Sequence, residues 1–66
     1  MKGTVKWFSE EKGFGFISAD EEEKDLYFQR GSIDIPSHSL MEGQRVAFDV
    51  TKTTKGPEAI NIHLAD

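Results

Sequence analysis

Short apolar runs separated by turn residues follow one another along the whole chain, and none of them carries the 3.6-residue period of an amphipathic helix. Valine, isoleucine and aromatic residues dominate these runs, while glycine, proline, serine and charged residues fill the gaps. This pattern is typical of β-strands, and it predicts five of them, over residues 3–9, 13–18, 25–30, 45–51 and 58–64. An all-β, small closed barrel is the expected architecture, because closure leaves no strand edge exposed.

The alternation of side chains along a strand predicts which residues are buried. Apolar residues occupy one face of each of the last three expected strands, and polar or small residues occupy the other. The residues expected on the core side are Leu26, Phe28, Val46, Phe48, Val50, Ile60, Ile62 and Leu64.

The second expected strand places its aromatic residues unusually. In KGFGFI, residues 12–17, alternation puts Phe14 and Phe16 on one face and the two glycines with Ile17 on the other. The glycine face allows a neighbouring backbone or a bulky core side chain to come close. We therefore expect Phe14 and Phe16 to face water. The alternative that they belong to the core stays open at this point, since phenylalanine is usually buried.

The first expected strand is less regular. Strict alternation would bury Trp7 together with Val5, whereas a β-bulge near Trp7 would turn the indole outward. Aromatic residues of adjacent strands are expected to form an exposed patch, bordered by basic side chains. The rings of the patch are Trp7, Phe8, Phe14, Phe16 and Tyr27, and the basic residues are Lys6, Lys12 and Arg30.

Such a patch suits nucleobases, because every base has a π-face that stacks on aromatic rings. The basic side chains at its border would contact phosphates. A duplex hides its base faces, so we expect the partner to be single-stranded RNA or DNA. The competing interpretation is a protein-interaction module whose aromatic patch meets another protein. Steep weakening by salt is expected of phosphate binding and not of an apolar protein contact.

The charge balance works against nucleic-acid binding. The formal net charge is −4, which predicts weak long-range attraction to phosphate. Part of that charge is one acidic run, residues 20–23, which we expect to be a solvated loop.

Length and composition exclude several classes of protein. With 66 residues, one domain over 1–66 is expected, and a chain this short buries only about 60% of its unfolded surface. Cysteine is absent, so disulfides and thiolate metal sites are excluded. No apolar stretch suits a signal peptide or a membrane span, and a cytoplasmic protein is expected.

Catalysis and cofactor binding are not expected either. His38 and His63 lack the spacing of metal ligands. The carboxylates cluster in a loop with nothing to raise a pKa, so an enzyme is not expected. We expect no metal, no cofactor and no small-molecule substrate.

Four stretches of the chain resemble bacterial cold-shock proteins. GTVKWF (3–8) resembles the opening strand of that family, and KGFGFI resembles its first ribonucleoprotein motif. GQRVAFDV and KGPEAINI follow at the family's distances. The resemblance implies a five-stranded antiparallel OB-fold barrel with Trp7 exposed. It also implies binding of single-stranded, typically pyrimidine-rich RNA or DNA, and a role as RNA chaperone, in transcription antitermination or in cold-shock gene regulation.

The chain departs from the family in its third strand. The family's second motif typically reads Val-Phe-Val-His-Phe, whereas residues 26–30 read LYFQR. Gln29 and Arg30 thus replace two rings, which predicts fewer stacking positions and weaker binding. Arg30 can compensate, since a guanidinium stacks on bases and pairs with phosphate. Glu58 stands where the family commonly has glutamine, which puts a negative charge near the expected ligand path.

The resemblance also supplies the remaining site residues. His38 is the only candidate ring in the long connection over 31–41, and Lys55 is a candidate phosphate contact. A monomer is expected, with a strand-exchanged dimer hinged in that connection as the alternative. The complete set of expected binding residues is Lys6, Trp7, Phe8, Lys12, Phe14, Phe16, Tyr27, Gln29, Arg30, His38 and Lys55.

Overall fold

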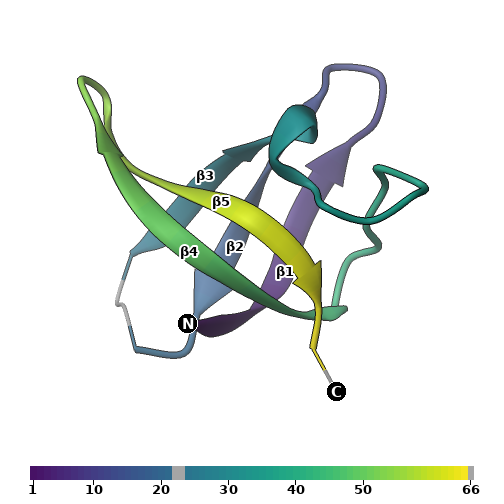
Figure 1. Cartoon of the computed structure of the whole chain (residues 1–66), viewed down its shortest axis with the longest axis horizontal. Helices are drawn as coiled ribbons and strands as arrows, with labels where there is room; N and C mark the ends of the chain where they lie inside the picture. Colours follow the sequence, from purple (N-terminus) through teal and green to yellow (C-terminus); the bar gives the residue numbers. More distant parts are fainter. Residues whose placement is uncertain (22–23, 66) are drawn as a thin grey trace.

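The computed structural model describes residues 1–21 and 24–65 and contains five strands (Figure 1). The strands are β1 (Lys2–Ser9), β2 (Phe14–Ala19), β3 (Asp25–Gln29), β4 (Arg45–Thr53) and β5 (Gly56–Leu64). Each lies within two residues of the range predicted from the apolar runs. A single 3₁₀ turn, η1 (Arg30–Ser32), follows β3 and was not predicted. The predicted acidic loop extends into residues 22–23, which lie outside the described part of the chain.

The strands close into a barrel in the order β1-β2-β3-β5-β4, which confirms the predicted architecture. All strand pairs are antiparallel except β3 and β5, which run parallel at Tyr27 and Glu58. This one pair departs from the antiparallel arrangement of the expected OB-fold barrel. A tight hairpin makes β5 antiparallel to β4, and closure then brings β5 alongside β3 in the same direction. Figure 1 shows the β4–β5 hairpin crossing the β1–β2–β3 meander.

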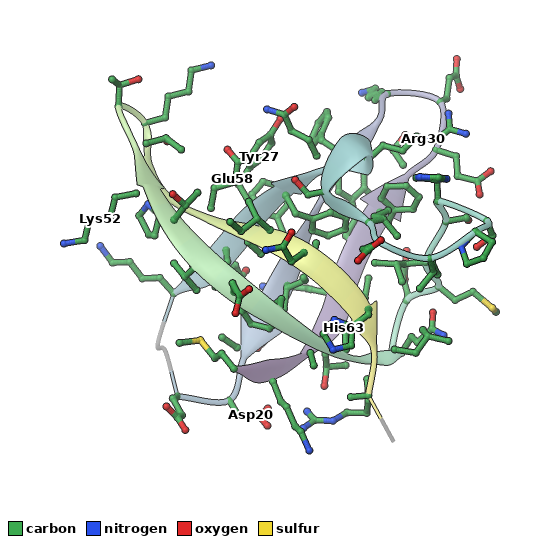
Figure 2. The ribbon with its side chains drawn as sticks, viewed as in Figure 1. Asp20, Tyr27, Arg30, Lys52, Glu58 and His63 are labelled. Carbon is green, nitrogen blue, oxygen red and sulfur yellow. The ribbon has the colours of Figure 1, made fainter. Side chains whose placement is uncertain are left out.

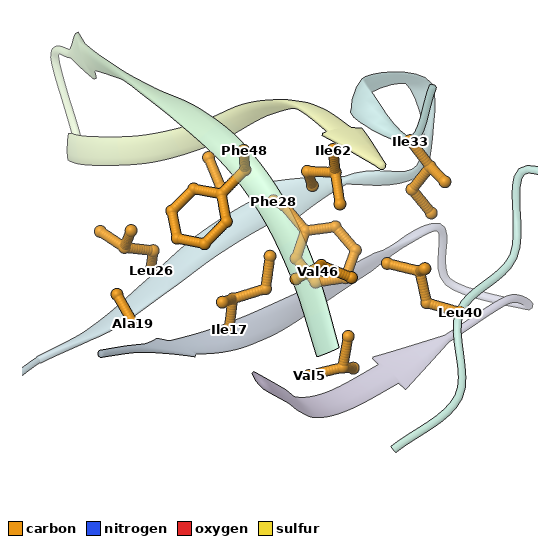
Figure 3. Close-up of a cluster of buried hydrophobic side chains, with 11 residues drawn as sticks. Val5, Ile17, Ala19, Leu26, Phe28, Ile33, Leu40, Val46, Phe48 and Ile62 are labelled. Carbon is orange, nitrogen blue, oxygen red and sulfur yellow. The ribbon is translucent and has the colours of Figure 1, made fainter. Parts of the chain in front are cut away.

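Eleven apolar side chains fill the barrel (Figure 3). They are Val5, Ile17, Ala19, Leu26, Phe28, Ile33, Leu40, Val46, Phe48, Ala59 and Ile62. The predictions of buried side chains on β3 and on the first half of β4 are confirmed. Val50 and Leu64 are instead 37% and 48% exposed. Ile60 is only partly buried.

A β-bulge in β5 explains why the prediction fails for Ile60, whereas the prediction for Ile62, which is fully buried, is confirmed. Ala47 of β4 pairs with His63 and Asp49 pairs with Ile60, so β5 holds one more residue than β4 over this stretch. Asn61 lies within the bulge and has a φ of 52°, in the left-handed region. The extra residue resets the alternation, which turns Ala59 and Ile62 into the core. Val50 lies nearer the hairpin tip, beyond the best-covered part of β4.

Gly15 of β2 permits the close approach that the sequence predicted for the glycine face. A Cβ atom at this position would lie 2.3 Å from the carbonyl oxygen of Trp7 and 2.8 Å from Cζ of Phe28. No other residue type fits without moving the backbone of β1. The glycine therefore lets β1 and a core ring pack directly against β2.

An ion pair between Arg45 and Asp20 joins the start of β4 to the turn after β2. The guanidinium donates hydrogen bonds of 2.8 and 2.6 Å to the two carboxylate oxygens, and another of 3.0 Å to Oγ1 of Thr4. The hydrogen bonds from Arg45, and to a lesser degree its charge, hold the pKa of Asp20 below its usual value.

Across residues 1–21 and 24–65, no helix is long and apolar enough to cross a membrane.

Candidate nucleic-acid interface

A β-bulge at Lys6 turns Trp7 outward. Val5 pairs with Ile17 while Trp7 pairs with Phe16, so β1 has one extra residue between these two pairs. Val5 is consequently buried and Trp7 is 36% exposed. The alternative left open by the sequence is thereby decided in favour of the bulge, as the family resemblance implied.

Four rings meet on the outward face of the β1–β2–β3 sheet, and we call them the aromatic cluster: Trp7, Phe14, Phe16 and Tyr27. The centroids of Trp7 and Phe14 are 5.3 Å apart, and those of Trp7 and Phe16 are 6.2 Å apart. Tyr27 lies 5.7 Å from Phe14 and 6.0 Å from Phe16. The ring planes are tilted by 30° to 90°, so no ring covers the whole face of another.

The strand register arranges part of the cluster in one row across the sheet. Trp7 pairs with Phe16, Phe16 pairs with Tyr27, and Tyr27 pairs with Glu58 of β5. Directly paired residues share a face of the sheet, so Glu58 continues the row that three rings begin. Ile17 and Phe28 lie on the opposite face and are fully buried. Phe14 and Phe16 are therefore outside the core, as predicted.

Phe8 does not belong to the cluster, and its predicted place in the exposed patch is wrong. It pairs with Gly15 and stacks on Phe28 at 5.5 Å with an angle of 17° between the rings. It packs against the core and is partly buried. The bulge that turns Trp7 outward reverses the alternation of β1, and the following residue consequently points inward.

Lys6 lies beside the cluster but is paired within the chain. Its Nζ atom donates a hydrogen bond of 2.8 Å to Oδ2 of Asp25. Lys6 and Asp25 line an open groove of about 390 Å³ together with Trp7 and Phe16. Asp25 was not among the predicted site residues, because its position opposite Ser18 depends on the register between β2 and β3.

A second groove, of about 520 Å³, lies where β3 meets the β4–β5 hairpin. Tyr27 and Gln29 of β3 form one wall, and the hairpin residues 53–58 form the rest. Lys55 lies in this wall, which supports its inclusion among the expected residues. Hydrogen bonds from Lys55 N to Thr53 Oγ1 (3.2 Å) and from that hydroxyl to the Gly56 carbonyl (2.8 Å) fix the hairpin tip.

Lys12 and Arg30 are exposed at the Phe14 end of the cluster. The Arg30 amide donates a hydrogen bond of 2.9 Å to the carbonyl of Gly13, the residue before Phe14. Lys12 lies in the preceding turn, where its amide donates to Ser9 Oγ at 3.2 Å. Figure 2 shows Arg30 on the side of the molecule opposite Lys52.

His38 lies apart from the cluster. It is exposed in the connection between η1 and β4, with a φ of 50°, and Nδ1 lies 3.3 Å from the Pro36 carbonyl. It lines neither groove. The structure therefore does not bring this ring into the expected site.

Residues 1–65 match the family model described as the "Cold-shock" DNA-binding domain. The chain belongs to the cold-shock domain family. This cold-shock domain is 46% identical over 63 residues to the cold shock-like protein CspE of Escherichia coli K12, covering 94% of this chain and 91% of the relative. It is 50% identical over 62 residues to the major cold shock protein of Streptococcus pyogenes serotype M6, covering 92% and 91%.

A solved structure supports the same assignment. The cold-shock domain superposes on the structure titled drosophila Unr CSD456 with a TM-score of 0.84 and 26% identity. The match covers 98% of this chain and 26% of that one, so this chain spans about a quarter of the length of that structure.

Proposed function

We propose that this cold-shock domain, as one domain over residues 1–66, binds single-stranded RNA or DNA by stacking bases on the aromatic cluster. The observation that carries the proposal is four neighbouring rings, each paired with at least two others, on the face opposite the core. Each base stacked on an aromatic side chain contributes about 1–3 kcal/mol, with little dependence on sequence. Duplexes hide the faces that would stack.

Electrostatic attraction contributes less than in a basic domain. Lys6 already pairs with Asp25, so a phosphate has to compete with a carboxylate for it. Lys12 and Arg30 lie at the Phe14 end of the cluster and Lys55 lines the second groove, and none of the three forms an ion pair with a described residue, so they are the side chains best placed to contact phosphates. Affinity then falls with salt, with a shallow slope set by these few contacts.

The biological role that fits such binding is that of an RNA chaperone or a transcription antiterminator in the cold-shock response. A protein that holds base faces competes with intramolecular base pairing, and base pairing grows stronger as the temperature falls. The protein acts in the cytoplasm, as a monomer, and by binding without catalysis. The match to cold shock proteins over nearly the whole chain does not favour the alternative of a protein-interaction module.

Quenching of Trp7 fluorescence tests the proposal, because the indole is part of the cluster. We expect oligothymidine and oligocytidine of about 6–8 nucleotides, within the usual range of about 4–16 for an OB-fold, to quench the emission at low salt. A duplex of the same length should have little effect. Unchanged emission, together with an unchanged amide spectrum at high micromolar oligonucleotide, would sink the proposal.

A further inference from the structure

Glu58 lies in the proposed site, at a position where a carboxylate can discriminate between ligand groups. It follows Trp7, Phe16 and Tyr27 in the paired row, and it lines the second groove with Tyr27. Figure 2 shows Tyr27 and Glu58 next to each other. The residue is partly buried and forms part of the wall of the groove.

The carboxylate of Glu58 has no partner in the part of the chain that the structure describes. The two ion pairs found there join Lys6 to Asp25 and Arg45 to Asp20. Asp25, which lines the groove beside Trp7, thus pairs with a lysine, whereas no described residue forms an ion pair or a hydrogen bond with the Glu58 side chain. Its acceptor capacity is available to a ligand.

The other groups in the groove do not discriminate between bases in the same way. The Gln29 amide and the hydroxyls of Tyr27 and Thr54 can each donate or accept a hydrogen bond. Lys55 only donates, and it attracts phosphate. Among the residues that line this groove, Glu58 is the one acceptor-only side chain, and its charge repels phosphate. A ligand in this groove would therefore place a base edge at Glu58 and a phosphate at Lys55.

A base stacked on Tyr27 presents its edge to the next strand, since neighbouring strands are only about 4.8 Å apart. Cytosine carries an N4 amino group, which donates to a carboxylate, whereas thymine and uracil carry an O4 acceptor at the same place. We propose that Glu58 makes this position of the site select cytosine over thymine and uracil. This inference rests on the proposed function, because it presumes that a base stacks on Tyr27.

The test compares the dissociation constants of oligocytidine and oligothymidine of equal length, followed by Trp7 fluorescence, for the full chain and for Glu58→Gln. Glutamine has nearly the same shape as glutamate, but its amide can either accept or donate a hydrogen bond. The variant should therefore no longer discriminate between cytosine and thymine. We expect the ratio of the thymidine to the cytidine dissociation constant to fall by roughly tenfold in Glu58→Gln. Most of the change should come from tighter binding of oligothymidine.

Glu42→Gln is the matched control, since Glu42 is exposed in the turn before β4 and lines neither groove. It removes the same charge, so it should tighten both oligonucleotides alike and leave their ratio unchanged. If Glu58→Gln still binds and its ratio of dissociation constants is within twofold of the wild-type ratio, the proposed selectivity is overturned, while the proposed function stands. A ratio that changes equally in Glu42→Gln would also overturn it. Failure of wild type to bind either oligonucleotide would overturn the proposed function as well.

Discussion

Replacing Phe16 by alanine tests whether this residue serves binding or belongs to the core. Phe16 is partly buried on the outward face, and it contacts Trp7 at 6.2 Å and Tyr27 at 6.0 Å between centroids. Aromatic pairs contribute about 0.5–1.5 kcal/mol each, so losing these two pairs should lower the free energy of unfolding by about 1–3 kcal/mol. Binding should lose the stacking of one base, about 1–3 kcal/mol, which corresponds to roughly a 5- to 150-fold rise in Kd.

The comparison variant is Phe28→Ala, in the adjacent strand but on the core face. Phe28 is fully buried, and its replacement should cost about 3–5 kcal/mol of unfolding free energy. Urea unfolding measures the stability of both variants. Isothermal titration calorimetry measures binding, because the loss of Phe16 alters the environment of Trp7 and hence its fluorescence.

Val50→Ala serves as the binding control, since Val50 is exposed on β4 and lines neither groove. Its affinity for oligocytidine should equal that of wild type. The reasoning is refuted if Phe16→Ala binds within twofold of wild type. It is also refuted if Phe16→Ala loses as much stability as Phe28→Ala, because Phe16 would then belong to the core.

Three further predictions follow from the contacts described above. Gly15→Ala forces a Cβ against the Trp7 carbonyl oxygen and should cost about 1–3 kcal/mol or more, measurable as a large fall in Tm; a Tm within 2 °C of wild type, on the order of a few tenths of a kcal/mol, would contradict it. Arg30→Ala should weaken binding and reduce the salt slope by about one phosphate contact, whereas tighter binding by Arg30→Phe would instead make the lost ring the main defect. Asp20→Asn should melt below wild type at neutral pH, because the lowered pKa of Asp20 means that the ion pair stabilises the fold above the unfolded pKa of about 3.9 and is lost as the pH falls through the folded pKa; a difference in Tm that does not narrow as the pH is lowered would argue against the ion pair.

The positions of the strands and the outward face of β2 were predictable because both depend on local patterns. Apolar runs between turn residues mark each strand, and the glycines beside Phe14 and Phe16 indicate which face is tightly packed. Ile17, on the glycine face, is fully buried as this pattern requires.

The two bulges were beyond the sequence pattern, because each depends on how a strand pairs with its neighbour. The bulge at Lys6 turns Trp7 outward and Phe8 toward the core, and the bulge at Asn61 moves Ala59 inward, whereas Leu64 is exposed at the end of β5. The second groove was missed for a related reason. It forms only when the barrel closes between β3 and β5, which are separated in the sequence by η1, the long connection and β4.

The row from Trp7 to Glu58 draws one residue from each of four strands, so it exists only in the closed barrel. A ligand that binds this row binds the folded chain alone, and folding and occupancy are then thermodynamically linked. At a free ligand concentration of 100 times Kd, the linkage adds about 2.7 kcal/mol to the stability of the fold. For a chain of this length, whose intrinsic stability is on the order of 3–10 kcal/mol, that is a substantial share. Cellular proteases that act on the unfolded chain would therefore degrade ligand-free protein faster than ligand-bound protein. The concentration of single-stranded nucleic acid would then help to set the lifetime of the protein.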